Sequence, residues 1–326
     1  MNKLHPMPDA NLQDMNTKRA ILIINLGTPS DPSEESIRSY LKQFLSDPRV
    51  VDLPRWLWLP ILNLIILRVR PRKLVEKYQL IWGSHDGPIR NFTQALANRV
   101  QELLGNVPVH NAMTYGQPSV SEAIEKIGDV EEIVVLPLFA QYASATTGAA
   151  EDALKAASNN KHVKIRFIDD YHDDPGYIEA LVDTINNHKM YKDLSPFILF
   201  SFHGIPASQS LKDTRYQEQC LNTSKLIAKQ LKISDNQWRT AFQSRFGPLP
   251  WLKPYTDKTM ESLPSEGIKN VLVICPGFAV DCLETIEEIA VQNRDIFLAA
   301  GGESFGYVKA LNASWSHAKV IANLVT

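Results

Sequence analysis

The stretch FILFSFHGIPAS, residues 197–208, contains the features that decide the fold. Its apolar run lacks the polar alternation of a half-exposed strand, which is typical of a parallel strand buried on both faces. The run ends in His203, after which Gly204 and Pro206 stop the strand and turn the chain. In open α/β sheets, ligands bind just beyond the carboxyl ends of the strands. We therefore expect His203 at the edge of a binding site.

Further apolar runs of strand length occur along the chain, at AILIINLG (20–27), VEEIVVLPLF (130–139), HVKIRFI (162–168) and IKNVLVICPGF (268–278). Stretches with helical periodicity, such as SEESIRSYLKQFL (33–45) and NFTQALANRVQELL (91–104), lie between them. This alternation predicts an α/β fold in which helices flank parallel sheets.

Three pairs of short segments recur in the same order. They are ILIINLGTPS (21–30) with ILFSFHGIPAS (198–208), TYGQP (114–118) with RFGPLP (245–250), and VVLPLFA (134–140) with VICPGFA (273–279). Three ordered matches favour duplication of one βα unit, and hence two similar domains. When Gly27 is matched with Gly204 and Gly116 with Gly247, the first half has 46 more residues than the second between its opening strand and its YG turn.

This interval contains LPRWLWLPILNLIILRVRPRK, residues 53–73, an apolar run with basic flanks. It has two interpretations: a buried core helix, or an apolar lip of a pocket that rests on a membrane surface. Pro60 interrupts the run, and tryptophan beside basic residues is typical of segments that lie on a membrane without crossing it. We favour the lip, and on that interpretation Trp58 and Leu62 are expected to be partly exposed.

The composition restricts the function class. The 326 residues suit two domains, and 34 basic against 36 acidic residues give a net charge of −2, so nucleic-acid binding is not expected. The first 19 residues lack the apolar core of a signal peptide, and no uncharged run is long enough to span a membrane, so we expect a cytoplasmic protein. Cys220, Cys275 and Cys282 form no CxxC pair and cannot supply four thiolates to an iron–sulfur cluster.

Comparison of the two halves points to two ionisable residues. His203 stands where the first half has Leu26, and Glu284 stands where it has Ala145. Each has a structural alternative: His203 as a buried histidine bonded to a backbone carbonyl, and Glu284 as the capping-box partner of Asp281 at a helix start. An imidazole and a carboxylate at one sheet edge would instead suit ferrous iron, and imidazole exchanges protons near neutrality.

Longer motifs resemble one known family. They are SFHGIPAS (201–208), FQSRFGPLPWLKPYTD (242–257), VICPGFAVDCLETIEEI (273–289), PLFAQYASATTGA (137–149), IDDYHDDPGYIEAL (168–181), YLKQFLSDPRVVDLPR (40–55) and VKALNASWSHA (308–318). Together they resemble ferrochelatase, which inserts ferrous iron into a porphyrin to complete haem. The resemblance runs from about Ala20 to the C-terminus.

The resemblance implies two similar Rossmann-like, chelatase-type domains, each a four-stranded parallel sheet flanked by helices, with a porphyrin cleft between them. On this basis we divide the chain into a first domain (19–172) that includes the lip, a second domain (173–305), and a C-terminal helix (306–326) that packs back on the first domain. The expected substrates are protoporphyrin IX and ferrous iron, with peripheral membrane contact through the lip.

The resemblance also assigns roles to particular residues. His203 and Glu284 match the pair that faces the porphyrin centre, and Asp281 and Glu288 match an acidic stripe that leads away from them. From the chemistry of the side chains we expect His203 and Glu284 to meet the metal, with His203 as the proton acceptor and Glu284 passing protons outward or receiving the incoming iron. Arg70 and Lys73 match the basic edge that binds porphyrin propionates, and Tyr142 matches a tyrosine of the opposite wall.

The chain departs from the family pattern at KDTRYQEQC (212–220), which keeps Tyr216, Gln219 and Cys220 but lacks the Gly and Pro common in relatives, and at Thr114, where some relatives have arginine. Animal relatives have a cysteine-rich C-terminal extension that holds a [2Fe–2S] cluster, whereas this sequence ends at HAKVIANLVT (317–326) without such cysteines, so we expect no iron–sulfur cluster. Two alternatives remain open: a related chelatase that uses another metal or coproporphyrin, and a non-catalytic porphyrin or haem carrier.

Overall fold

The computed structural model describes residues 19–83, 86–159 and 161–326. Residues 1–19, whose composition argued against a signal peptide, lie outside these ranges except for Arg19. The first half contains β1 (Arg19–Gly27), α1 (Glu34–Leu45), α2 (Arg55–Ile61), η1 (Leu62–Ile66), α3 (Leu67–Ile81), α4 (Pro88–Leu104), β2 (Val109–Tyr115), α5 (Val120–Ile127), β3 (Glu132–Pro137), η2 (Ser144–Gly148), α6 (Ala149–Ser158) and β4 (Lys164–Phe167).

The second half contains α7 (Pro175–Asn187), α8 (Lys189–Leu194), β5 (Phe197–His203), α9 (Ala207–Lys212), α10 (Arg215–Leu231), η3 (Asp235–Gln237), β6 (Trp238–Gln243), α11 (Thr256–Ser262), η4 (Leu263–Glu266), β7 (Asn270–Ile274), η5 (Glu284–Asn293), α12 (Arg294–Ala299), β8 (Ser304–Val308) and α13 (Trp315–Val325). The segments η1, η2 and η5 are π-helical, whereas η3 and η4 are 3₁₀-helical.

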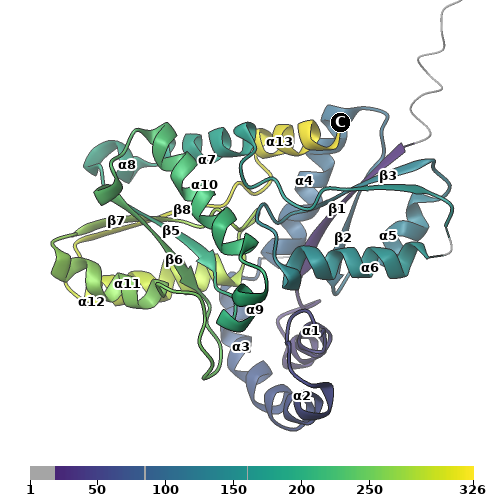
Figure 1. Ribbon diagram of the computed structural model, residues 1–326, viewed down its shortest axis with the longest axis horizontal. Coiled ribbons are helices and arrows are strands. Elements are labelled where there is room, and N and C mark those ends of the chain that lie inside the picture. The colour runs from purple at the N-terminus through teal and green to yellow at the C-terminus, as the bar shows by residue number, and fades with distance from the viewer. Residues whose placement is uncertain (1–18, 84–85, 160) are drawn as a thin grey trace, which may run out of the picture.

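Each half contains a four-stranded parallel sheet, and the two sheets have the same topology (Figure 1). Their orders are β2-β1-β3-β4 and β6-β5-β7-β8, so each strand of the second sheet has a counterpart in the first. The three repeated segments lie at the carboxyl ends of corresponding strands: β1 and β5, β2 and β6, β3 and β7. The predicted α/β fold with two similar parallel sheets is confirmed.

Strand pairing corrects the length of the insertion. Asn25 pairs with Met113, 88 residues later, whereas its counterpart Phe202 pairs with Phe242, 40 residues later, so the excess is 48 residues and not 46. The prediction was wrong because it matched two glycines that occupy different positions, Gly116 three residues after Met113 and Gly247 five residues after Phe242. The turn after β6 is longer than the turn after β2.

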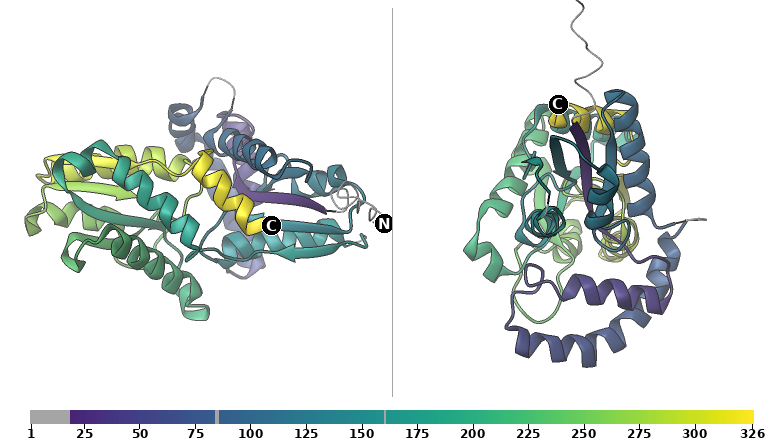
Figure 2. Two further views of the ribbon diagram at one scale, coloured as in Figure 1. Left: turned by 90° about the horizontal axis from the view of Figure 1, so that it is seen from above. Right: turned by 90° about the vertical axis from the view of Figure 1, so that its right-hand side faces the viewer.

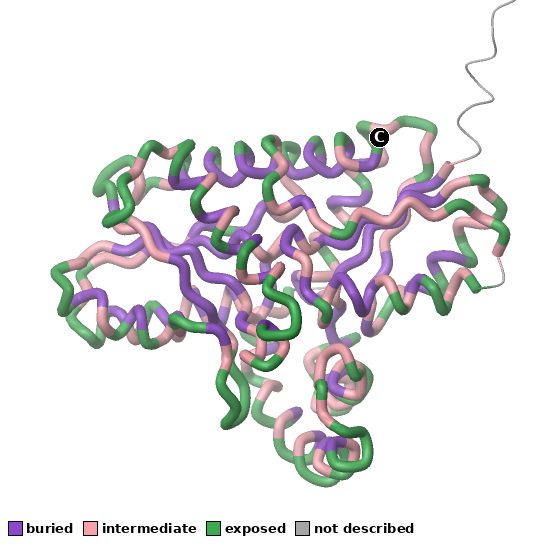
Figure 3. The backbone as a smooth tube through the Cα atoms, in the orientation of Figure 1, coloured by how far each residue is buried: buried purple, intermediate pink, exposed green. Residues whose placement is uncertain are grey.

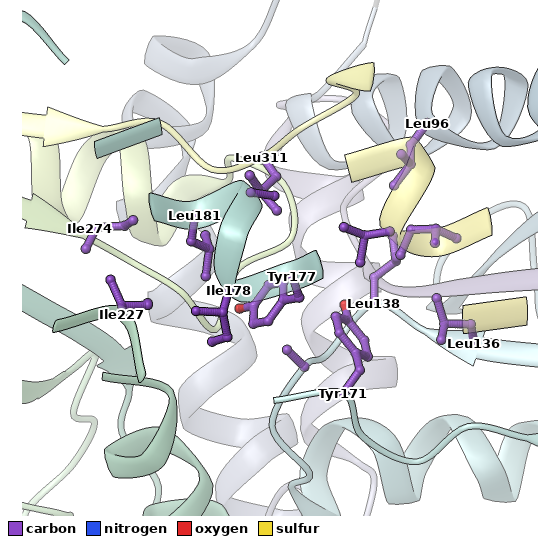
Figure 4. Packing of buried hydrophobic residues seen from close by; sticks show 14 of the residues in the cluster. Leu96, Leu136, Leu138, Tyr171, Tyr177, Ile178, Leu181, Ile227, Ile274 and Leu311 are labelled. Atoms are coloured by element: carbon purple, nitrogen blue, oxygen red, sulfur yellow. The ribbon is translucent and has the colours of Figure 1, made fainter. Parts of the chain in front are cut away.

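One hydrophobic core extends across both sheets. Its buried residues include Leu136 of β3 and Ile274 of β7, and between the sheets it contains Tyr171 and Tyr177, whose rings meet edge to face at 5.3 Å (Figure 4). Helices α7 and α13 run along one side of both sheets (Figure 1). Helix α13 packs against α4 and α7, and the carbonyl oxygen of Val325 accepts hydrogen bonds from the first-half residues Arg19 and Arg166.

The insertion forms a separate layer of helices outside the sheets. Elements α1, α2, η1 and α3 lie toward the bottom of the molecule in Figure 1 and in the right view of Figure 2. They share a small core in which Trp58 and Leu62 are buried, and Trp58 Nε1 donates to the carbonyl oxygen of Leu45 at 2.7 Å. The expectation that Trp58 and Leu62 are partly exposed was therefore wrong, because these side chains face α1.

The other face of the same segment is apolar and exposed. Figure 3 shows exposed and buried residues alternating along it. Trp56 is 78% exposed, and Leu57, Leu64, Ile65 and Val69 are also exposed. Residues 53–73 thus have one buried face, as the core-helix interpretation predicted, and one exposed apolar face, whereas contact of the exposed face with a membrane stays a prediction. Within the described ranges, no helix is both long enough and apolar enough to cross a membrane.

Candidate functional site

His203 ends β5 at the carboxyl edge of the second sheet. Its Nδ1 lies 2.6 Å from the carbonyl oxygen of Gly204, and its own carbonyl oxygen accepts a hydrogen bond from the hydroxyl of Tyr216 at 2.7 Å. Because a carbonyl oxygen can only accept, Nδ1 carries a proton, and neutral His203 has Nε2 as its proton acceptor. Trp251 and Phe278 lie near the ring, each with its centroid 6.4 Å away. The carbonyl contact expected for a structural histidine is therefore present and orients the ring.

Glu284 begins the π-helical segment η5, which follows β7. The predicted capping box with Asp281 is absent: η5 begins after Leu283, and no side chain caps it. Gln243 Nε2 instead donates to the backbone carbonyl of Glu284 at 2.8 Å. The half-buried carboxylate of Glu284 therefore has no capping role, and the structural explanation weighed for it is wrong.

Asp281 has a structural role. Its buried carboxylate accepts hydrogen bonds from Tyr307 Oη at 2.6 Å, Asn312 Nδ2 at 2.7 Å, Thr285 Oγ1 at 3.1 Å and the backbone N–H of Ala310 at 3.3 Å. These four hydrogen bonds hold the Asp281 side chain in place and fix the turn before Glu284. Asp281 therefore does not continue an acidic stripe with Glu284 and Glu288, because Asp281 and Cys282 precede the first helical residue.

Glu288 lies four residues after Glu284 on η5. Its carboxylate accepts from the backbone N–H of Ser244 at 2.7 Å and from Ser244 Oγ at 2.5 Å. Burial raises the pKa of Glu288; the Ser244 hydrogen bonds and the nearby His203 lower it, and the negative charge of Glu284 adds to the rise. The three side chains are therefore close enough to influence one another. A carboxyl group with a raised pKa is suited to accepting a proton from a histidine.

Gln243 joins these residues, and sequence analysis missed it. Its backbone pairs with His203 in the sheet, its amide nitrogen donates to the carbonyl of Glu284, and its amide oxygen accepts from Ser201 Oγ at 2.6 Å. The next residue, Ser244, has φ of 65° and binds Glu288. The motif FQSRFG contained both residues, but its sequence gave no sign of what they contact.

Arg70 and Lys73, the residues predicted to bind porphyrin propionates, lie in different environments. Arg70 of α3 places its guanidinium 4.2 Å from the ring centre of Phe246, and burial lowers its pKa while Tyr78 and Glu284 oppose that shift. Arg70 therefore belongs to the neighbourhood of Glu284. Lys73 is exposed on the same helix. Among the described residues, no contact links Lys73 to His203 or Glu284.

Tyr142 lies after β3, where it meets the second half. The guanidinium of Arg215 lies 3.4 Å from its ring centre, and its backbone N–H donates to Gln219 Oε1 at 2.6 Å. Tyr216, next to Arg215, binds the carbonyl of His203. The residues that follow the altered KDT sequence thus contact both Tyr142 and His203, although no described contact joins those two directly.

These side chains do not form a closed metal site. Within the described ranges, the one group of three residues with ligand atoms within 4.8 Å of one another is Asp170, His172 and Asp173. The ligand atoms of His203, Glu284 and Glu288 do not all lie within that distance of one another.

Comparison with protein families decides the classification, because a model of the family described as Ferrochelatase matches residues 18–326. The chain belongs to the ferrochelatase family. Ferrochelatase from Alcanivorax borkumensis is 45% identical over 325 residues, with 97% of this chain and 95% of the relative covered. Ferrochelatase from Mannheimia succiniciproducens is 47% identical over 317 residues, with 95% and 97% covered. Membership in the ferrochelatase family makes the chain a metal chelatase.

Solved structures agree on the fold. SirB from Bacillus subtilis with Fe3+ matches with a TM-score of 0.55 at 12% identity, covering 95% of this chain and 96% of SirB. CbiX, described as the terminal enzyme for biosynthesis of siroheme in denitrifying bacteria, matches with a TM-score of 0.52 at 16% identity, covering 94% and 97%. This chain therefore shares its overall fold with these proteins.

Proposed function

We propose that this chain inserts ferrous iron into protoporphyrin IX, forming protohaem and releasing two protons, as the last step of haem synthesis. The observation that carries the proposal is the arrangement of His203, whose Nε2 is free to accept a proton, near Glu288, whose burial raises its pKa. Full-length similarity to ferrochelatases supports the choice of iron and porphyrin.

The proposed reaction depends on moving two protons. A free-base porphyrin carries two inner N–H protons, and its nitrogens can hold a divalent ion only after these have left. His203 Nε2 accepts a proton from the ring, and Glu288 takes it from His203, because a carboxyl group with a raised pKa binds protons more readily than an ordinary carboxylate. Glu288 then releases this proton to solvent, and the second ring proton follows the same route through His203. Glu284 receives the incoming ferrous ion or passes protons outward.

In this proposal the porphyrin lies between the sheet edge and the insertion. Arg70 and Lys73 bind propionates, and Tyr142 forms part of the opposite wall. Arg70 would leave Phe246 for a propionate and so exchange a cation–π contact for a charge-assisted hydrogen bond, which is the stronger of the two.

We also propose that the exposed face of residues 53–73 rests on the cytoplasmic side of a membrane. Trp56, Ile65 and their apolar neighbours are exposed beside exposed Arg68 and Arg72. This combination favours binding at the interface of an anionic bilayer. The division of the chain into residues 19–172, 173–305 and 306–326 is likewise a proposal.

The test is anaerobic incubation of the purified protein with ferrous iron and either protoporphyrin IX or coproporphyrin, while the free-base absorption spectrum is followed. Conversion of protoporphyrin to haem supports the proposal. Faster conversion of coproporphyrin, or a preference for cobalt or nickel, would indicate the related chelatase. Porphyrin binding without insertion of any metal would indicate a carrier.

A further inference from the structure

Among the described residues, one ion pair links the insertion directly to the segment that carries Glu284 and Glu288. Lys77 Nζ of α3 lies 3.1 Å from Glu287 Oε2 of η5. Both oxygens of Glu287 also accept from Gln292 Nε2, at 2.5 and 2.7 Å. The Glu287 side chain is 11% exposed and that of Lys77 is 38% exposed. Glu287 therefore points away from solvent, toward the insertion.

The burial of Glu287 makes this pair different from the other links between the insertion and the second half. Lys212 and Asp52 also form an ion pair, but their side chains are 67% and 47% exposed. Exposed pairs contribute little, whereas removing Lys77 would leave the largely buried carboxylate of Glu287 without this cation. The contact between Lys77 and Glu287 is thus the ionic contact that best fixes α3 relative to η5.

Apolar packing gives η5 a second attachment to the insertion, at the residue that precedes Glu284. Leu283 packs against the small core of the insertion, which includes Tyr40 and Tyr78. Glu284 therefore lies between two residues, Leu283 and Glu287, that are both attached to the insertion. A shift of α3 would move the backbone of Glu284 with it, and that of Glu288 as well.

We propose that Lys77 and Glu287 are positioning residues. Their ion pair ties η5 to α3, so that the position of the insertion determines where the Glu284 and Glu288 side chains lie. Seating of the porphyrin under α3 and placement of the acidic side chains above the ring are thereby coupled. The inference rests on the proposed iron insertion but makes a separate claim, because neither Lys77 nor Glu287 needs to contact porphyrin or metal.

The test compares Lys77→Met, Glu287→Gln, the double variant, and the swapped pair Lys77→Glu/Glu287→Lys. We expect each single change to lower kcat for anaerobic iron insertion about tenfold, equal to about 1.4 kcal/mol in the activation barrier. Porphyrin affinity should stay within about twofold, since the ring contacts are intact. The double variant should lose no more than either single variant, and the swapped pair should recover activity.

A second measurement does not depend on turnover. Hydrogen exchange of a peptide covering residues 284–293 should be faster in Lys77→Met than in the unchanged protein, since η5 loses an attachment. The matched control is Lys155→Met with Glu151→Gln, which removes an ion pair within α6, far along the chain from this site. The control should change neither kcat nor exchange at 284–293.

Three results would overturn the inference. The first is unchanged kcat and unchanged hydrogen exchange in both single variants, and the second is a loss of kcat in the double variant that equals the sum of the single losses. The third is a loss of kcat that is fully explained by a lowered melting temperature of the variants. Failure of the proposed function is recognised separately, because the unchanged protein would then insert no iron while the exchange difference could still be measured.

Discussion

At the scale of single residues, the hydrogen bond at Nδ1 determines what His203 can do. Nδ1 is occupied by the carbonyl oxygen of Gly204, so proton transfer falls to Nε2. The backbone of His203 is also held, because its carbonyl oxygen accepts a hydrogen bond from the Tyr216 hydroxyl. These contacts orient the imidazole before any substrate arrives.

Replacement of His203 by alanine tests the proton-acceptor role. We expect porphyrin binding, measured by quenching of protein fluorescence, to change little, because the ring is held mainly by other groups. Iron insertion should fall by a factor of about 10² or more, the usual contribution of a positioned acid or base. His162→Ala, at an exposed position, is the control. Turnover within a few-fold of the control would remove His203 from this role.

Glu284→Gln separates chemistry from structure at the second position. The variant keeps the side-chain length, and the structure shows no cap that it could break. We expect an unchanged melting temperature and a loss of iron insertion of about 10². The exposed Glu125→Gln serves as the control for loss of one carboxylate. Normal insertion by Glu284→Gln would show that this carboxylate has no part in the reaction.

At the scale of elements, the insertion has two faces with different tasks. Trp58 and Leu62 hold its helices to α1, whereas Trp56 and Ile65 face solvent. A Pro-interrupted helix, a π-helical turn and a third helix thus form one layer that is anchored on one side and apolar on the other. The sequence of the segment alone did not distinguish these faces, because both are apolar.

Paired serine substitutions distinguish the two faces. Trp56→Ser/Ile65→Ser should weaken co-sedimentation with anionic liposomes and leave the melting temperature nearly unchanged. Trp58→Ser/Leu62→Ser should lower the melting temperature sharply, since each large buried side chain removed costs about 2–5 kcal/mol. Leu103→Ser/Trp315→Ser, at exposed positions on α4 and α13, is the control. Unchanged liposome binding by the first variant would exclude membrane contact through this face.

At the scale of the whole molecule, the shared core makes the two sheets one folding unit. Residues from β1, β3, β5 and β7 meet in a single buried cluster together with α7 and α13. We expect a single thermal unfolding transition, with circular dichroism and calorimetry giving the same midpoint. Two resolved transitions would mean that this core does not couple the halves.

The C-terminal helix should make stability sensitive to acid. His317 of α13 is fully buried, its Nδ1 lies 2.6 Å from the carbonyl oxygen of Asn312, and burial lowers its pKa to about 4. Above pH 6.5 the side chain is neutral in both the folded and unfolded states. Between about pH 6.5 and 4 the unfolded state binds a proton that the folded state does not, so the free energy of unfolding falls.

The size of this effect can be measured with His317→Gln. Relative to the variant, the unchanged protein should lose about 2 kcal/mol of unfolding free energy between pH 7.5 and pH 5. Denaturant unfolding at the two pH values gives the difference directly. Parallel changes in the two proteins would mean that His317 does not cause the acid sensitivity.

Some features could be predicted because they depend on local pattern. Continuous apolar runs such as 197–203 revealed buried parallel strands, and their repetition revealed two similar sheets. His203 was placed correctly at a strand end for the same reason. The insertion length was wrong by two residues because a turn glycine such as Gly247 can occupy different positions after a strand.

The sequence by itself determined the α/β class, the duplication and the strand-end histidine, since hydrophobic periodicity and turn residues act over a few neighbouring positions. Only the tertiary structure decided the surroundings of the acidic residues. Asp281 is fully bonded, Glu287 is paired with Lys77, and Glu288 is buried beside Ser244. These residues lie within eight positions of one another, yet their partners come from α3, the turn after β6 and the C-terminal segment, because burial and electrostatics depend on groups that are distant in sequence and adjacent in space.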